Sequence, residues 1–275
     1  MTEPRSGGVG RVLSAQFGNG HGTFADRQAI TRLHQAWPGL RDALSHENAF
    51  QLRVVTAAYN TGIAQFVFLG HDYPTTLGPV FQAACLATSD PAGIVVVESD
   101  PESRAAWHAA RFPVSVKVSA RDRWAAGSVL TDLPARGIDL ARPVCLVVGN
   151  AATYTASTEH VDAQLARYRA ALPPGSWMAL SHLTAELTDG SDFAAGASVF
   201  RRLIDAVPVS RTRDDVKALF GDWPLLSPGV CPAQQWRPDD AQYARHVHTS
   251  PGTWSGVARH SGSAASLPWP PGVLA

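Results

Sequence analysis

The sequence has no long apolar run, no excess of charge of one sign and few cysteines. No apolar stretch reaches the roughly 18 residues that a membrane span requires. The 23 basic and 23 acidic residues give a formal net charge of 0, whereas nonspecific nucleic-acid binding usually needs a basic surface. The 3 cysteines lie too far apart for a metal site or a disulfide framework, and the N-terminal segment lacks the apolar core of a signal peptide. We therefore expect a cytoplasmic protein that binds neither membrane nor nucleic acid.

Several catalytic motifs are also absent from the sequence. The chain contains no G-x-S-x-G elbow and no Walker loop, which argues against common hydrolases and nucleotidases. The histidines show no H-E-x-x-H spacing, and we expect no metal site. Apolar residues nonetheless make up 45% of the 275 residues, enough for a folded chain with a sizeable core.

The centre of the chain alternates between apolar runs and helical patterns. Valine-rich runs predict strands at 65–69, 94–98, 114–118, 144–148 and 177–180. Three of these runs lack polar alternation, as is typical of parallel strands buried on both faces. Helical spacing predicts helices at 24–36, 41–59, 77–88, 102–111, 125–133, 159–172, 193–206 and 213–220. The alternation predicts an α/β fold, with extended pieces near 225 and 231–236 as an antiparallel finish to the sheet.

Polar residues at the ends of these strands are the candidates for chemistry, because open α/β sheets bind ligands there, where the strand order reverses. Gly70 either lets the backbone approach a ligand or is a simple turn glycine. The Glu98 carboxylate either accepts both ribose hydroxyls of a nucleoside or faces a helix dipole. His71 and Asp72 are either an acid–base pair or a solvated loop. His182 is either a base or a structural hydrogen-bonding residue.

Many short motifs occur in one order along most of the chain, among them FADR, GIAQF, LPPGS, LSH and WRPD at residues 24–27, 62–66, 172–176, 180–182 and 236–239. Through them, residues from about 10 to 240 resemble the actinobacterial S-adenosylmethionine (SAM) methyltransferases first described as a domain of unknown function. The resemblance implies a class I methyltransferase (Rossmann-like) fold, with a mostly parallel seven-stranded sheet, helices on both faces and an N-terminal helical cap.

This resemblance suggests a division of the chain into four parts. We expect a flexible arm at 1–10, the helical cap at 11–62 and the Rossmann-like methyltransferase domain at 63–240. Residues 241–275 are rich in Ser, Gly and Pro, so we expect a disordered tail there.

The resemblance also implies a set of cofactor contacts. SAM would lie over Gly70, with its ribose on Glu98 and its adenine near Ser119 and Ala120. Its methionine carboxylate would meet Arg53, for which an ion pair at the surface is the alternative.

The cofactor loop departs from the family pattern. The family motif D-L-G-T-G-L-P-T is replaced by FLGHDYPT at residues 68–75, so a strand-end carboxylate and the second glycine are missing. Each lost charge-assisted hydrogen bond is worth roughly 1.5–3 kcal/mol. His71, Asp72 and Asn150 are candidates to replace the lost contacts.

Three functions are compatible with the sequence. The first is a SAM-dependent methyltransferase of secondary metabolism that acts on a small molecule, with His71, Asp72 or His182 as the base where the nucleophile carries a proton. The second is a SAM-independent cyclase, eliminase or isomerase on the same fold, with Tyr73 and Tyr154 lining its pocket. The third is a non-catalytic partner subunit. The oligomeric state stays open, and a homodimer is one alternative.

Overall fold

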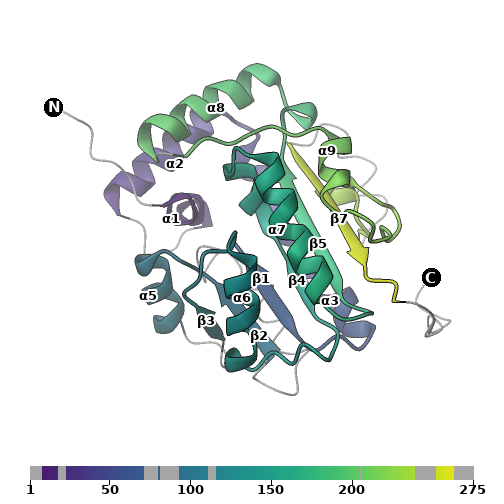
Figure 1. The fold of residues 1–275 in the computed structure, drawn as a ribbon. Helices are drawn as coiled ribbons and strands as arrows, with labels where there is room; N and C mark the ends of the chain where they lie inside the picture. The colour runs from purple at the N-terminus through teal and green to yellow at the C-terminus, as the bar shows by residue number, and fades with distance from the viewer. Residues whose placement is uncertain are drawn as a thin grey trace.

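The protein is built on a seven-stranded sheet. The computed structural model describes residues 8–17, 23–70, 80, 93–110, 116–204, 206–238 and 252–262. The strand order is β3-β2-β1-β4-β5-β7-β6 (Figure 1). β1 to β5 run parallel to one another, whereas β7 is antiparallel to β5 and β6. The strands are β1 Phe66–Leu69, β2 Ile94–Val97, β3 Lys117–Ser119, β4 Cys145–Val147, β5 Trp177–Leu183, β6 Cys231–Pro232 and β7 Thr253–Arg259.

The order of the strands reverses between β1 and β4, which are hydrogen-bonded neighbours. A crevice for ligands is therefore expected beyond the carboxyl ends of these two strands. The mostly parallel seven-stranded sheet of the class I methyltransferase fold is confirmed.

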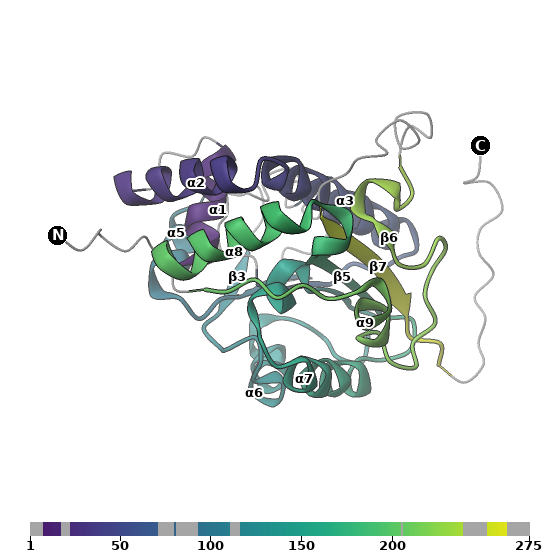
Figure 2. The same cartoon turned by 90° about the horizontal axis from the view of Figure 1, so that it is seen from above.

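Helices cover both faces of the sheet (Figure 2). The cluster on one face includes Phe50 of α3 and Trp107 of α5, and the cluster on the other includes side chains of α6, α7 and α9. Every residue of β1, β2 and β4 is buried, which explains why these strands appear as unbroken apolar runs. The helices are α3 Leu40–Asn60, α5 Pro101–Ala109, α6 Ala126–Asp132, α7 Thr158–Ala171 and α9 Arg213–Ala218.

A third apolar cluster forms a cap at the carboxyl end of the sheet. It joins α1 (Val9–Ser14), α2 (Phe24–Ala36), the first half of α3 and α8 (Gly190–Leu203). α2 and α8 lie side by side in both views (Figures 1 and 2). The predicted cap at 11–62 is thus incomplete, because α8 comes from much later in the chain and the second half of α3 packs on the sheet instead.

Charged side chains tie the cap to the sheet domain. α2 begins at a capping box in which the Thr23 hydroxyl accepts from the Asp26 amide and the Asp26 carboxylate accepts from the Thr23 amide (2.8 Å). The buried Asp26 also pairs with Arg11 of α1 at 2.8 Å. Arg11 reaches on to Glu102 in the first turn of α5. α1 is therefore held against the edge of the sheet domain that follows β2.

The predicted disordered tail is wrong for residues 252–262. Thr253–Arg259 form β7, which lies between β5 and β6 and whose residues 255–258 are all buried. This segment carries Ser255, Gly256 and Ala258 rather than an apolar run, so its local pattern predicts no strand. Its conformation comes from pairing with β5, whose residues lie 70 to 82 positions earlier in the chain than their partners.

The other boundaries follow the prediction closely. Every predicted helix within the described residues ends within three residues of the observed one, whereas the third strand lies at Lys117–Ser119 instead of 114–118. The predicted arm is too long, since α1 begins at Val9. The helix predicted at 77–88 lies outside the described residues, apart from Val80. The short 3-10 helices are η1 Ala15–Phe17, η3 Pro134–Arg136, η4 Gly149–Tyr154, η5 Ala185–Leu187 and η6 Ala233–Gln235.

None of the helices in the described part of the chain combines the length and apolar character that a membrane crossing requires.

Candidate functional site

The strand register places the predicted cofactor residues on one edge of the sheet. Leu69 pairs with Val97, so the residues that follow them, Gly70 and Glu98, are neighbours at the carboxyl edge. β3 ends level with Leu69 and β4 ends one residue short of that level, with Ala120 and Asn150 close behind them. The parallel sheet thus gathers at its switch point segments that are far apart in the sequence.

Gly70 is a position where only glycine fits. Its φ is +83°, in the left-handed region that side chains disfavour. An added Cβ would lie 2.5 Å from the Cβ of Ala151 and 3.4 Å from the Arg123 guanidinium. Gly70 therefore lets η4 pack directly against the end of β1.

Glu98 is a buried carboxylate at the end of β2, with 1% of its surface exposed. Its Oε1 accepts from the Asp100 amide at 2.7 Å and lies 3.5 Å from Nη2 of Arg123. Asp100 is itself the N-cap of α5, where its carboxylate accepts from the Ser103 amide at 2.7 Å. A carboxylate fixed in this way can accept both hydroxyls of a ribose, so Glu98 fits the binding of SAM.

Arg123 is part of this site, although no feature of the sequence singles it out. Its guanidinium lies beside both Gly70 and Glu98, and its backbone carbonyl accepts from the Tyr168 hydroxyl at 2.8 Å. It follows β3 by only four residues, which is the one signal that could have included it.

The adenine contacts predicted after β3 need a correction. The Ser119 hydroxyl donates to the Asp132 carboxylate at 2.7 Å, and the residue is fully buried. The Ser119 side chain is thus engaged by α6 and turned away from a cofactor. Ala120 is exposed at the carboxyl edge, so a contact at this level falls to Ala120 and to the backbone.

Arg53 does not lie where a methionine carboxylate would bind. Its guanidinium donates to the backbone carbonyls of Trp236 (2.9 Å) and Ala233 (2.7 Å). Because α3 runs back toward the start of β1, Arg53 lies away from the carboxyl edge. Here it fastens η6 to α3, and the cofactor role predicted for it is not supported.

The geometry of His182 is that of a structural residue. Its Nδ1 lies 2.6 Å from the Leu183 carbonyl and its Nε2 lies 2.8 Å from Arg211, with no part of the residue exposed. Burial and the nearby Arg211 lower the pKa of His182 to about 3. The imidazole is therefore neutral, with both nitrogens engaged, and is a poor general base.

Of four further predicted site residues, only Tyr154 lies within the described part of the chain. His71, Asp72 and Tyr73 lie outside the described residues. Tyr154 is partly buried in the cap, where its ring lies 5.5 Å from that of Phe200. It thus faces the apolar interior between η4 and α8.

A buried polar cluster at the carboxyl edge was not predicted. Its centre is Glu47 of α3, which accepts from the Ser181 hydroxyl at 2.7 Å, from the Gln51 amide at 3.1 Å and from the Asn150 amide. Asn150 is therefore engaged with Glu47, and the expected compensation of a lost cofactor contact is not its observed role. The available signal was a carboxylate within the buried stripe of α3, between Leu44 and Phe50.

Burial raises the pKa of Glu47 to about 7, because desolvation outweighs the three hydrogen bonds that favour the ionised form. As the pH rises, Glu47 therefore loses its proton at a lower pH in the unfolded chain than in the folded protein. Stability from this group is complete below about pH 4.5 and is lost as the pH rises to 7, by about 3 kcal/mol at 1.36 kcal/mol per pH unit.

We expect the Glu47→Gln variant to lack this loss. Denaturant titrations at pH 4.5 and 7.5 should give a free energy of unfolding whose decrease is smaller in the variant by about 3 kcal/mol. Glu159→Gln on the exposed start of α7 is the control. If the free energy of unfolding falls equally with pH in wild type and in Glu47→Gln, the raised pKa does not belong to Glu47.

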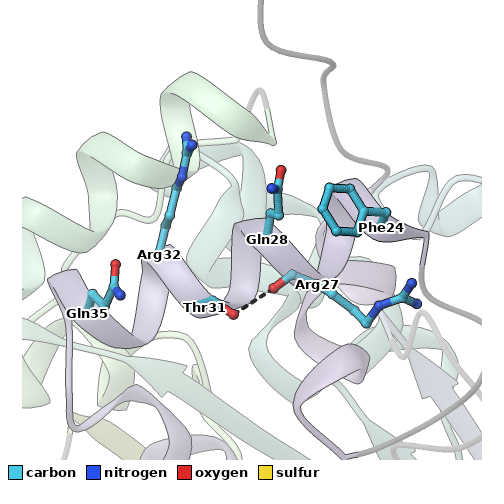
Figure 3. A pocket seen from close by; sticks show the side chains of 6 residues that line it. All are labelled: Phe24, Arg27, Gln28, Thr31, Arg32 and Gln35. Carbon is cyan, nitrogen blue, oxygen red and sulfur yellow. Dashed lines mark hydrogen bonds between the residues drawn. The ribbon is translucent and has the colours of Figure 1, made fainter.

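A hollow of about 400 Å³ lies on the outer face of α2 (Figure 3). Its lining contains no carboxylate, histidine or cysteine and lies on one surface helix, so we do not assign the reaction to it. Within the described residues, no group of three or more His, Cys, Asp or Glu side chains could hold a metal ion. The hollow is lined by Phe24, Arg27, Gln28, Thr31, Arg32 and Gln35.

Comparison with known proteins agrees with this architecture. The chain is similar to a methyltransferase candidate from Thermobifida fusca YX, at 26% identity and a TM-score of 0.80, over 93% of this chain and 95% of that chain. It is also similar to a DUF574 family protein from Streptomyces avermitilis MA-4680, at 25% identity and a TM-score of 0.80, over 92% of this chain and 97% of that chain. No curated protein matches the sequence.

A family model decides among the three functions that the sequence left open. The model of the S-adenosyl methyltransferases matches residues 6–261, nearly the whole chain. The match favours an enzyme that uses SAM over a SAM-independent enzyme and over a non-catalytic subunit. This protein belongs to the S-adenosyl methyltransferase family.

Proposed function

We propose that this methyltransferase acts on a small molecule of secondary metabolism, in the cytoplasm. The observation that carries the proposal is the position of the cap, whose α1, α2 and α8 cluster with the ends of β5 and η4. An acceptor must fit beneath these helices, which favours a small molecule over a polymer. The formal net charge of 0 also speaks against a nucleic acid as the acceptor.

Different residues of the carboxyl edge contact or support different parts of the cofactor. SAM, when bound, supplies an activated methyl group. Glu98 accepts the ribose hydroxyls, and the Arg123 guanidinium lies 3.5 Å from the same carboxylate. Gly70 lets Ala151 of η4 pack directly against the end of β1, which fixes the backbone at this edge beside Glu98. The protein thereby contributes alignment and exclusion of water, which are the main requirements of methyl transfer.

The Glu98→Ala variant tests this arrangement. Loss of a charge-assisted hydrogen bond worth roughly 1.5–3 kcal/mol should weaken binding of S-adenosylhomocysteine by at least about tenfold. Calorimetric titration of the purified protein with S-adenosylhomocysteine, and separately with SAM, measures this. Glu159→Ala, at an exposed glutamate in the first turn of α7, should bind like wild type.

Two results would count against the proposal. An unchanged dissociation constant in Glu98→Ala would remove Glu98 from the ribose site. Folded wild-type protein that binds neither compound at millimolar concentration would separate this chain from the chemistry of its family.

A further inference from the structure

The polar cluster around Glu47 has two buried acceptors with no partner among the described residues. The amides of Gln51 and Asn150 and the hydroxyl of Ser181 all donate to the Glu47 carboxylate. Asn150 Oδ1 and Gln51 Oε1 are buried and have no hydrogen-bond partner among the described residues. Asn150 is only 8% exposed and Gln51 only 1%. Buried acceptors in this state are costly to leave unpaired, so the cluster suits a ligand that brings donors.

Once Glu47 is ionised, its charge has no counterion among the described residues. No Lys, Arg or His in the described ranges forms an ion pair with Glu47, and no charged group contributes to the shift of its pKa. A buried carboxylate held only by neutral donors is stabilised strongly by a cation at hydrogen-bond distance. A ligand that brings donors and a positive charge together meets both needs.

The position of the cluster connects it to the cofactor edge. Asn150 is followed by Ala151, the residue that packs directly against Gly70. Ser181 lies two residues after Ala179, which pairs with Val147 at the end of β4, so its side chain lies just beyond that level at the carboxyl edge. Asn150 therefore stands between the glycine of the cofactor site and Glu47.

We propose that Glu47, Asn150 and Gln51 form the binding site for the amino group of the methyl acceptor. An ammonium group brings three N–H donors and one positive charge, whereas a hydroxyl brings one donor and no charge. The cluster offers one carboxylate and two amide oxygens, which matches the ammonium group. The proposal rests on the methyl-transfer function, and it narrows the acceptor to an amine.

Carbon-13 labelling of the glutamate carboxyls allows a direct test, because the chain has only Glu3, Glu47, Glu98, Glu102, Glu159 and Glu186. The Glu47 resonance is identified by its loss in Glu47→Gln. Phenethylamine is titrated at pH 8 against 2-phenylethanol, which has the same shape but a hydroxyl in place of the amine. The amine should shift the Glu47 resonance and bind at least about tenfold more tightly than the alcohol, a difference of about 1.4 kcal/mol.

The variants sharpen this comparison. Glu47→Gln keeps the shape of the side chain and removes the charge, so it should lose at least about tenfold in amine affinity. The control Glu159→Gln should not. S-adenosylhomocysteine should bind Glu47→Gln as it binds wild type, since Glu47 is assigned to the acceptor and not to the cofactor.

Equal binding of amine and alcohol, absence of amine binding, or full amine affinity in Glu47→Gln would each overturn the inference. If Glu47→Gln fails to fold, the wild-type comparison of amine with alcohol still decides. Failure of the methyl-transfer function itself has a different signature. In that case S-adenosylhomocysteine does not bind wild type, while the amine still shifts the Glu47 resonance.

Discussion

A chain that ends after Pro251 should fail to fold, whereas a chain that ends after Gly262 should fold like the full protein. The shorter chain lacks β7, which pairs with β5 along seven residues and with β6 on its other side. It also removes Val257 from the core on the α3 face and Ala258 from the core on the α7 face. The loss of one central strand is comparable to the whole stability of a domain, about 5–15 kcal/mol.

The two chains are compared by near-ultraviolet circular dichroism and by thermal unfolding. The chain that ends after Gly262 keeps β7 and the contact of Gly262 with Pro174, so it controls for truncation as such. A cooperative unfolding transition in the shorter chain would show that β7 is an accessory strand.

Gly70→Ala should produce the largest loss of stability among single substitutions at the cofactor edge. A left-handed φ costs a residue with a side chain roughly 1–2 kcal/mol. The new Cβ would also overlap the Ala151 side chain at 2.5 Å, and overpacking typically costs about 1–3 kcal/mol. We expect a total of about 2–5 kcal/mol, together with weaker binding of S-adenosylhomocysteine, because Ala151 and its backbone in η4 must move.

Gly62→Ala is a matched control for this experiment. Gly62 has a φ of +90°, but an added Cβ there meets nothing within 4 Å. Its substitution should therefore cost only the backbone term, about 1–2 kcal/mol. The difference between the two variants in denaturant titration isolates the contact with Ala151, and Ala151→Gly should recover part of the loss in Gly70→Ala. Equal losses of unfolding free energy at both glycines would show that η4 shifts to accommodate the new side chain with no loss of stability.

The sequence alone determined the central architecture. Strands such as Ile94–Val97 are apolar at every position, and helices such as Phe24–Ala36 carry their own start signal at Thr23 and Asp26. Such features act over a few residues, so they can be recognised without the fold. The placement of Gly70 and Glu98 also followed, because parallel strands bring their carboxyl ends to one edge.

Only the tertiary structure decided the polar contacts at that edge. Glu47 meets Asn150 and Ser181 across 103 and 134 residues of chain, and Arg53 is held by Trp236 across 183. Local sequence pattern carries no information about partners so distant. β7 belongs to the same class, because its small residues acquire a strand conformation only between β5 and β6. The role of each polar side chain thus depends on partners that are distant in the sequence. For this reason Arg53 and His182 looked like site residues in the sequence, whereas Glu47 did not.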